Sequence, residues 1–377
     1  MSFSKLLFCL ASLQCIAASS RQKTMVEHIF GMDHNQIDDG AEYVEWREAS
    51  QDDPTFAQGY FLKDAAAGPD NAKCLDGTPP LYYHRPGTGD GANKWYIHQE
   101  GGGWCGNPAN CLDRAHSSLG STINDTDSRS LNSGYFSIDP TQNPLMYNWN
   151  AVFLRYCDGA SVAGDLAVPA VVGTQSINFR GRAILDAEIA SLLQDRGLKS
   201  ATDVVVSGCS AGGLATFLHC DKWAAALSTA TGNTAKVVCM PDSGFFVDYE
   251  GYGAMMRNIA DFQAVTAAGV NADCFAAHTA TNDTEVCMLA QYSSQHIKTP
   301  TFPLQSQFDS WQYVGELSNP TDAEFNEYGR NLTTILSSDL LAQKQHGAFL
   351  DSCFSHCGNW GGPIIDTSNA GQALNLW

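Results

Sequence analysis

Short hydrophobic runs rich in β-branched and aromatic residues alternate along the chain with longer segments in which apolar residues recur at helical spacing. Such alternation is typical of a mostly parallel sheet, because parallel strands are joined by crossover helices that pack on the sheet. The pattern therefore predicts an α/β fold with a mostly parallel central sheet flanked by helices. The runs expected to form strands are 81–84, 94–98, 151–156, 203–207, 236–240 and 301–305.

Helical periodicity is clearest in two segments. From Leu185 onward, apolar residues recur at i, i+4, i+7 and i+8, which predicts a helix between the third and fourth strands. A second helix should begin near Thr321, because Thr321 and Glu324 have the spacing of a capping box. The residues predicted to line the buried faces are Leu185, Ile189, Leu192 and Leu193 in the first helix, and Phe325, Tyr328, Leu332 and Leu336 in the second.

Residues 1–19 have the composition of a secretory signal peptide. Lys5 precedes the apolar run 6–13, and small residues follow this run. The run is shorter than the roughly 18 residues that a membrane-spanning helix needs, and no later stretch of the chain has the length and apolarity of a span. We therefore predict a secreted, extracellular protein, with the cell wall as one setting.

The rest of the chain reads as one large domain with insertions. We predict an N-terminal extension of uncertain structure, 20–73, followed by the α/β domain, 74–377, because no linker, repeat or charge block divides the chain further. The segments 43–73 and 115–150 have weak periodicity and many turn formers, so we expect loops or insertions there. Insertions of this kind often shape a binding pocket.

The charge balance narrows the choice of partners. The chain has 21 Lys and Arg residues against 40 Asp and Glu residues, a net charge of -19. Binding to nucleic acid is excluded as a function class, because phosphate contacts need clustered basic residues. We expect a monomer with surface glycans, and the candidate acceptor sites are the Asn-x-Ser/Thr sequons at Asn124, Asn282 and Asn331.

The cysteine count predicts a disulfide-bonded protein. Removal of the signal peptide takes away Cys9 and Cys15 and leaves eleven cysteines in a compartment where disulfides persist. An odd number leaves one thiol over, and we expect it to be Cys209, buried as a small apolar side chain. The pairs suggested are Cys105/Cys111, Cys274/Cys287 and Cys353/Cys357 over short loops, and Cys74/Cys157 and Cys220/Cys239 over longer ones.

The strongest motif surrounds Ser210. A run of three valines leads into Gly208-Cys209-Ser210-Ala211-Gly212, and residues compatible with a helix follow. This is the strand, sharp turn and helix of a nucleophile elbow, as in an α/β-hydrolase-like fold. The turn requires small residues two positions before and after the serine, which Gly208 and Gly212 provide. We predict that Ser210 is a nucleophile; a purely structural turn is the alternative.

A glycine-rich loop is the candidate partner of this elbow. Three glycines precede Trp104 and Cys105, directly after the strand predicted at 94–98. In such folds one oxyanion donor is the amide after the nucleophile, here Ala211, and the second comes from a loop of this type. We therefore expect the amides of Gly103, Trp104 and Ala211 to form the oxyanion hole.

The base and the acid should follow the nucleophile along the chain. His356 is the favoured base, because its loop is rich in cysteines and a bridge would hold it rigid. Its surroundings also resemble a zinc site, but cysteines of an exported chain usually form disulfides, so we expect no metal. Asp309, at the end of a predicted strand, is the favoured acid, and Asp242 is the alternative.

Together these motifs resemble the pectin acetylesterase and Notum family of carboxylesterases. The resemblance implies Ser210, Asp309 and His356 as the catalytic triad, and it places Asp242 outside it. Cys209 and the triple glycine are closer to the plant pectin acetylesterase form. The segments that match are 100–105, 148–150, 155–159, 179–181, 208–213, 242–246, 309–312 and 352–357.

These observations predict a serine carboxylesterase that acts through an acyl-enzyme and needs no metal or organic cofactor. The expected substrate is an acetyl ester on an extracellular polysaccharide. The strong negative charge favours a neutral or methyl-esterified stretch over an unesterified polyanion. Two alternatives are a Notum-like deacylase that removes a longer acyl chain from a protein, and a catalytically silent glycan-binding protein on the same scaffold.

Overall fold

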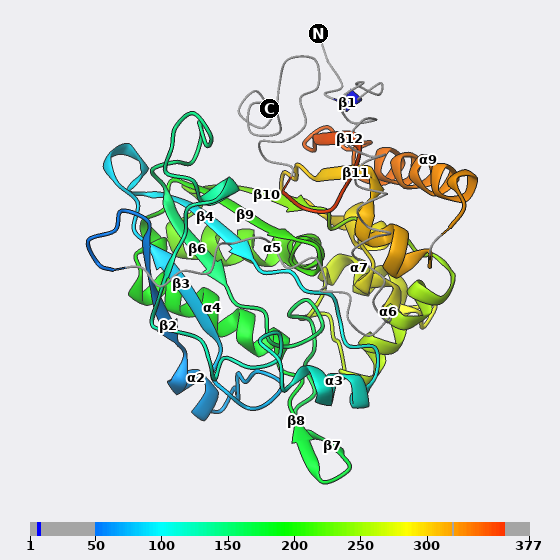
Figure 1. Cartoon of the computed structure of the whole chain (residues 1–377), viewed down its shortest axis with the longest axis horizontal. Helices are drawn as coiled ribbons and strands as arrows, with labels where there is room; N and C mark the ends of the chain where they lie inside the picture. The colour runs from blue at the N-terminus through cyan, green and yellow to red at the C-terminus, as the bar shows by residue number, and fades with distance from the viewer. Residues whose placement is uncertain (1–5, 9–49, 319, 359–377) are drawn as a thin grey trace, which may run out of the picture.

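A ten-stranded sheet runs through the molecule in the computed structural model, which describes residues 6–8, 50–318 and 320–358 (Figure 1). The strand order is β1-β12-β11-β10-β9-β4-β6-β3-β2-β5. In this spatial order, the first seven strands, from β1 at the edge through β6, pair in parallel. The β6–β3, β3–β2 and β2–β5 pairs are antiparallel. The strands are β1 (Leu6–Phe8), β2 (Phe56–Phe61), β3 (Leu81–Arg85), β4 (Lys94–Gln99), β5 (Ser128–Ser130), β6 (Asn150–Leu154), β9 (Asp203–Cys209), β10 (Lys236–Asp242), β11 (Leu304–Asp309) and β12 (Ala348–Ser355).

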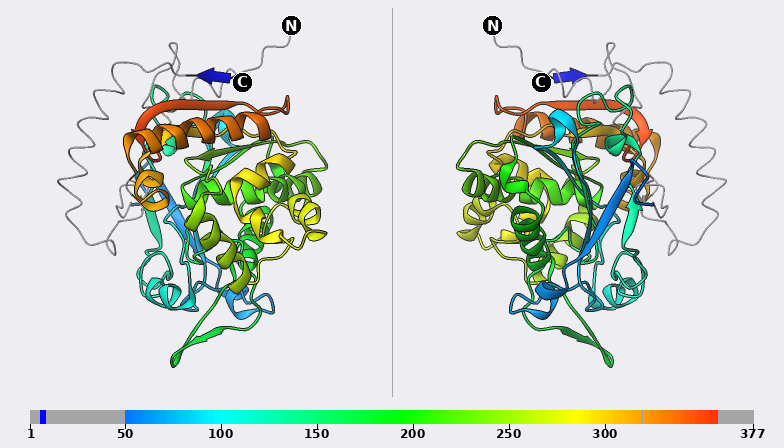
Figure 2. Two further views of the ribbon diagram at one scale, coloured as in Figure 1. Left: turned by 90° about the vertical axis from the view of Figure 1, so that its right-hand side faces the viewer. Right: turned by 90° about the vertical axis from the view of Figure 1, so that its left-hand side faces the viewer.

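Helices pack against this sheet, as the sequence predicts. The central helix α5 contacts β9 and β10, and α9 lies beside β11 and β12 (Figures 1 and 2). A separate hairpin, β7 (Ala170–Val172) and β8 (Gln175–Ile177), projects from the body of the molecule. The α-helices are α2 (Lys63–Ala67), α3 (Pro108–Arg114), α4 (Gly181–Asp195), α5 (Ala211–Thr231), α6 (Glu250–Phe262), α7 (Ala272–Thr279), α8 (Ala290–Ser293) and α9 (Asp322–Asp339).

The two helices read from periodicity form as expected. Of the residues assigned to the buried face of α4, Leu193 is half-buried and the others are buried. The capping box at Thr321 is present: its hydroxyl accepts from the Glu324 amide, and the Glu324 carboxylate accepts from the Thr321 amide. All four apolar residues assigned to the inner face of α9 are buried.

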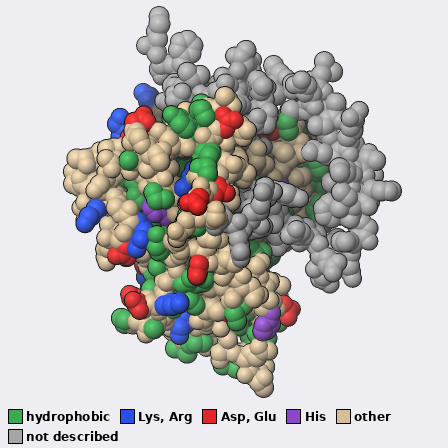
Figure 3. Space-filling model, turned by 60° about the vertical axis from the view of Figure 1, so that its left-hand side comes forward, with side chains coloured by type: hydrophobic (Ala, Val, Ile, Leu, Met, Phe, Trp, Pro, Cys, Tyr) green, Lys and Arg blue, Asp and Glu red, His purple; other side chains and the backbone are tan. Residues whose placement is uncertain are grey.

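The core consists of two main clusters on opposite sides of the sheet. Alternate side chains of the central strands, such as Ile97 and Val206, join the helices in the larger cluster. Their neighbours, such as Tyr96 and Val205, pack on the other side against residues of the segment 131–149. Acidic and basic side chains lie scattered among uncharged ones on the face drawn in Figure 3.

The sheet also contains strands in segments expected to be loops. β2 and β5 pair with each other inside the segments 43–73 and 115–150, and β2 continues the sheet beyond β3. Part of the expected N-terminal extension, 20–73, thus belongs to the sheet, and its residues 20–49 lie outside the described residues. The expected signal peptide also lies outside them, apart from residues 6–8, which form β1 beside β12.

The strand expected at 301–305 is displaced toward the C-terminus. Thr301 forms only an isolated bridge with Cys239, and the regular strand β11 runs from Leu304 to Asp309. Pro300 and Pro303 flank this bridge, and neither can donate a hydrogen bond to a neighbouring strand. Among the described residues, no helix is both long and apolar enough to cross a membrane.

Candidate active site

Ser210 occupies the sharp turn between β9 and α5. Its backbone has φ 58° and ψ -122°, a conformation that costs a residue with a side chain about 1–3 kcal/mol. Two hydrogen bonds hold the turn: the Ser210 amide donates to the Asp242 carbonyl at 3.0 Å, and the Leu214 amide donates to the Ser210 carbonyl at 2.8 Å. The serine is completely buried at the N-terminus of a 21-residue helix.

The two glycines of the elbow are required by close backbone contacts. A Cβ atom on Gly208 would lie 2.3 Å from the carbonyl oxygen of Gly212. A Cβ atom on Gly212 would lie 2.0 Å from the carbonyl oxygen of Gln99. Both distances are far below van der Waals contact, so the helix can approach β4 this closely only where the side chains are absent.

The glycine-rich loop after β4 runs directly against the elbow. A Cβ atom on Gly101 would lie 3.0 Å from the Cβ of Ser210, and Gly102 and Gly103 have φ values of 129° and 60°. In the described part of the chain, no acceptor takes the backbone N–H of Gly103, Trp104 or Ala211. These three donors, which the sequence proposes for the oxyanion hole, are therefore available beside the serine.

Two residues that the sequence did not single out brace this loop. The Tyr156 hydroxyl donates to the Gly103 carbonyl at 2.8 Å. Ser161 accepts from the Trp104 indole at 2.8 Å and donates to the Ala211 carbonyl at 2.8 Å. The loop and the first turn of α5 are thus connected through one buried hydroxyl, a link between distant segments that no local sequence signal reveals.

A buried ion pair anchors the start of the loop. Arg155 donates to the Glu100 carboxylate, which also accepts from the Tyr156 amide at 2.8 Å. Arg155 pairs with Asp125 as well, at 3.1 Å. Burial raises the pKa of Glu100, and the adjacent guanidinium partly opposes that rise.

Asp309 and His356 meet at the carboxyl ends of neighbouring strands. Asp309 is the last residue of β11, and His356 directly follows β12, whose final residue Ser355 pairs with Asp309. The Nδ1 atom of His356 lies 2.8 and 2.9 Å from the two carboxylate oxygens of Asp309. Asp309 also accepts from the amides of Trp311 and Gln312, at 2.9 and 3.0 Å. The carboxylate is held from three sides.

The Nε2 atom of His356 and the hydroxyl of Ser210 are not hydrogen-bonded to each other. Both atoms are buried and have no hydrogen-bond partner in the described part of the chain. The imidazole also lies beside the elbow, since one of its nitrogens is within 4.8 Å of the sulfur of Cys209, the residue before Ser210. The arrangement leaves an acceptor nitrogen and a hydroxyl free next to the oxyanion loop.

Asp242, the alternative acid, has different partners. Its carboxylate accepts from the hydroxyl of Tyr135 and from that of Ser243, the latter at 3.1 Å. Its position at the end of β10, paired with Cys209 and Leu304, puts it between the elbow and β11. The hydrogen bond to the His356 imidazole is made by Asp309 and not by Asp242.

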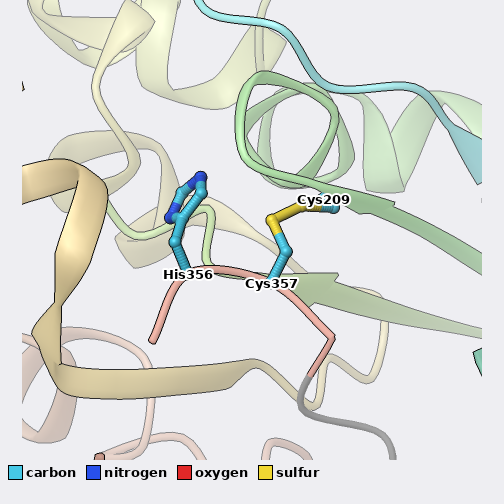
Figure 4. Close-up of side chains that lie close together, drawn as sticks. All are labelled: Cys209, His356 and Cys357. Carbon is cyan, nitrogen blue, oxygen red and sulfur yellow. A yellow bond between two sulfur atoms is a disulfide. The ribbon is translucent and has the colours of Figure 1, made fainter. Parts of the chain in front are cut away.

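The disulfides agree with the sequence in four cases and differ at the site. Cys74–Cys157, Cys105–Cys111, Cys220–Cys239 and Cys274–Cys287 form as expected. The prediction of a free Cys209 is wrong, because Cys209 is bonded to Cys357 (Figure 4). The predicted Cys353–Cys357 bridge is therefore also wrong, although Cys353 is disulfide-bonded. The sheet brings the ends of β9 and β12 together, and spacing along the chain could not reveal this.

Aromatic rings fill the space around the imidazole and the oxyanion loop. The Trp104 ring lies edge-on to Phe246 and Trp311, with centroid separations of 4.9 and 5.7 Å. The Trp311 ring is 6.1 Å from that of His356, and Tyr252 packs against Phe246 at 5.8 Å. The sequence did not identify Phe246, Tyr252 or Trp311 as lining residues.

A cavity of about 540 Å³ borders the start of the glycine-rich loop. Gly101 and Gly102 form part of its wall, and most of its other lining residues are polar or charged, including His116, Ser117 and Arg129. Asn124 of the first sequon also borders it. The acceptor residues of all three sequons are exposed, at Asn124, Asn282 and Asn331.

Comparison with known proteins identifies the family. The pectinacetylesterase family model matches residues 50–363. Pectin acetylesterase 11 of Arabidopsis thaliana is 33% identical over 84% of this chain and 86% of its own length. The palmitoleoyl-protein carboxylesterase NOTUM of Schmidtea mediterranea is 27% identical over 84% of this chain and 62% of its own.

The fold agrees with that of a solved structure. The Wnt deacylase Notum from Drosophila superposes with a TM-score of 0.74 at 24% identity, covering 85% of this chain and 92% of that one. The likeness shows that the α/β-hydrolase-like sheet is shared between them. From the family match and the similarity to curated relatives, the chain belongs to the pectinacetylesterase family and is a carboxylic ester hydrolase.

Proposed function

We propose that this protein is a secreted serine esterase that removes acetyl groups from an esterified extracellular polysaccharide. The observation that carries the proposal is the hydrogen bond between His356 and Asp309, formed beside a strained serine elbow. An acid that orients the imidazole leaves its other nitrogen free to accept the serine proton.

In this mechanism His356 takes the proton of Ser210 as the serine oxygen attacks the ester carbonyl. The tetrahedral oxyanion accepts hydrogen bonds from the amides of Gly103, Trp104 and Ala211, which have no other acceptor in the described part of the chain. His356 then protonates the leaving alcohol. Water, activated by the same imidazole, hydrolyses the acyl-enzyme and frees Ser210.

The aromatic cluster favours a short acyl group. Trp104, Phe246 and Tyr252 are all less than 10% exposed, and their rings pack against one another next to the oxyanion loop. An acetyl group needs little room, whereas a long acyl chain needs a deep apolar pocket. The second candidate, removal of a longer acyl chain from a protein, is supported by the similarity to Notum proteins and would require these rings to move apart.

The cavity beside Gly101 and Gly102, whose lining residues are mostly polar or charged, supports a glycan as the acceptor. Its lining offers hydroxyl, imidazole and guanidinium groups within reach of the loop that holds the oxyanion donors. A sugar ring presents several hydroxyl groups, and a wall of fixed donors and acceptors can pair with them.

A fluorophosphonate probe tests the chemistry. We expect wild-type protein to be labelled and to hydrolyse p-nitrophenyl acetate, and Ser210→Ala to lose labelling together with at least about 10⁴-fold in kcat. Ser207→Ala is the matched control: this buried serine lies three residues earlier on β9, where it donates to the Met240 carbonyl. Folded wild-type protein that does not react with the probe would support the silent glycan-binding alternative instead.

The length of the acyl chain tests the substrate. We expect kcat/KM on p-nitrophenyl esters to fall steeply beyond butyrate, because the aromatic rings leave little room for longer chains. Equal or better activity on palmitate would favour the long-chain deacylase.

A further inference from the structure

The Cys209–Cys357 disulfide lies between the neighbours of two site residues. Cys209 immediately precedes Ser210, and Cys357 immediately follows His356. Both sulfur atoms lie within 4.8 Å of an imidazole nitrogen, and Figure 4 shows the ring beside the bond. Since the sulfurs are bonded to each other, this Cys–His–Cys group offers no thiolate for a metal.

The bond joins strands that do not pair. In the sheet, β10 and β11 separate β9 from β12, so no backbone ladder connects the serine elbow to the segment with the histidine. After β12 the chain turns back at Cys357, which has a φ of 61°, and its amide donates to the Ser243 hydroxyl beyond β10 at 2.8 Å. The disulfide then joins Cys357 to Cys209 across the ends of β10 and β11.

The sheet alone holds His356 weakly. The pairing of β11 with β12 is irregular between Ser306 and Phe308 and ends at the Asp309–Ser355 pair. His356 is thus the first residue beyond the ladder, just past a bulge, where strand direction is less restrained. The Asp309 contact holds one side of the ring, and the hydrogen bond from the Cys357 amide to Ser243 holds the next residue. Among the contacts of this segment, the disulfide is the covalent one that reaches the residue before Ser210.

We infer that the Cys209–Cys357 disulfide is a positioning element for the esterase reaction, holding His356 within reach of Ser210. The inference rests on the proposed function and adds the residues that align its base and nucleophile. Among the disulfides between described residues, it is the one whose two cysteines each adjoin a member of the proposed triad.

The test compares two disulfide deletions. Cys209→Ala/Cys357→Ala removes the tie at the site, and Cys274→Ala/Cys287→Ala removes a bond between α7 and the short 3-10 helix that follows it. Both are assayed on p-nitrophenyl acetate below their unfolding temperatures. We expect the first variant to lose about 10- to 100-fold in kcat with KM nearly unchanged, because a displacement of about 1 Å can cost 10²-fold. The control should keep the wild-type kcat.

Two results would overturn the inference while leaving the proposed function intact. One is a folded Cys209→Ala/Cys357→Ala protein with the kcat of wild type. The other is an equal loss of kcat in both variants, which would make the effect one of general stability. Wild-type protein that neither hydrolyses the ester nor reacts with fluorophosphonate would instead contradict the proposed function itself.

If the site variant does not fold, wild-type protein can be titrated with dithiothreitol while activity, thiol positions and tryptophan fluorescence are followed together. Loss of activity that tracks reduction at Cys209 and Cys357, before the fluorescence reports unfolding, supports the inference. Activity retained after reduction of this bond, or reduction only on global unfolding, overturns it.

Discussion

The hydrogen bonds of two buried aspartates distinguish their roles. Asp309 and Asp242 are both completely buried at the ends of adjacent strands. Asp309 bonds the imidazole of His356, whereas Asp242 bonds the hydroxyls of Tyr135 and Ser243. Their positions in the chain leave both as candidates for the catalytic acid. The partner of each carboxylate distinguishes them, because Asp309 bonds the imidazole.

Substitution of these two acids tests the assignment. We expect Asp309→Asn to lower kcat by about 10³- to 10⁴-fold, because the amide cannot stabilise the imidazolium and favours the wrong tautomer. Asp242→Asn is the matched control and should cost far less, since its partners are hydroxyl groups. Ester hydrolysis and circular dichroism would be measured on both variants. A larger loss in Asp242→Asn would reverse the assignment.

The strand β12, which leads to His356, carries one buried acid. Asp351 is 1% exposed, and one of its carboxylate oxygens accepts from the Cys353 amide at 2.9 Å. The other oxygen has no partner in the described part of the chain. Burial raises the pKa of Asp351 to about 7, and the nearby carboxylates Asp242 and Asp309 contribute to the rise.

This acid makes stability depend on pH in a defined direction. Between about pH 4 and pH 7 the folded protein keeps the Asp351 proton while the unfolded chain, with an ordinary pKa near 3.9, has lost it. The free energy of unfolding therefore falls as pH rises through this window. We expect Asp351→Asn, which keeps an acceptor for the Cys353 amide, to be more stable than wild type by up to a few kcal/mol at pH 7 and by little at pH 4.

Urea unfolding at several pH values measures this difference. Asp139→Asn is a useful control, because its exposed carboxylate bonds only the neighbouring turn residues, which lower its pKa. If the difference in the free energy of unfolding between wild type and Asp351→Asn does not grow from pH 4 to pH 7, Asp351 ionises in the folded state as readily as in the unfolded chain.

The net charge of -19 should affect which polysaccharides the enzyme hydrolyses fastest. A strongly acidic protein repels a polyanion at long range, and salt screens that repulsion. We expect kcat/KM on acetylated pectin to be higher when the uronates are methyl-esterified than when they are free. The difference in kcat/KM between the two forms of pectin should become smaller as the salt concentration rises.

Acetate release from matched pectins at low and high salt provides the measurement. Hydrolysis of p-nitrophenyl acetate, a neutral substrate, serves as the control and should change little with salt. A preference for the free polyuronate at low salt would indicate that local basic groups, such as Arg129 at the cavity beside the loop, outweigh the net charge.

Local sequence was sufficient wherever the structure depends on neighbours in the chain. The capping box at Thr321, the glycines around Ser210 and the strands before them were readable, because a turn or cap is formed by residues a few positions apart. The resemblance to pectin acetylesterases and Notum added the expectation of ester hydrolysis. The strand at 301–305 was misplaced because two prolines interrupt the pairing there.

Contacts between distant segments could be read only from the folded chain. Local patterns in the sequence were enough to predict the α/β class, the elbow and the residue types for the chemistry. Strand order determined that Cys209 bonds Cys357, that β2 and β5 extend the sheet, and that Ser161 links Trp104 to Ala211. The physical reason is that hydrophobic periodicity specifies which face of an element is buried but not which partner buries it.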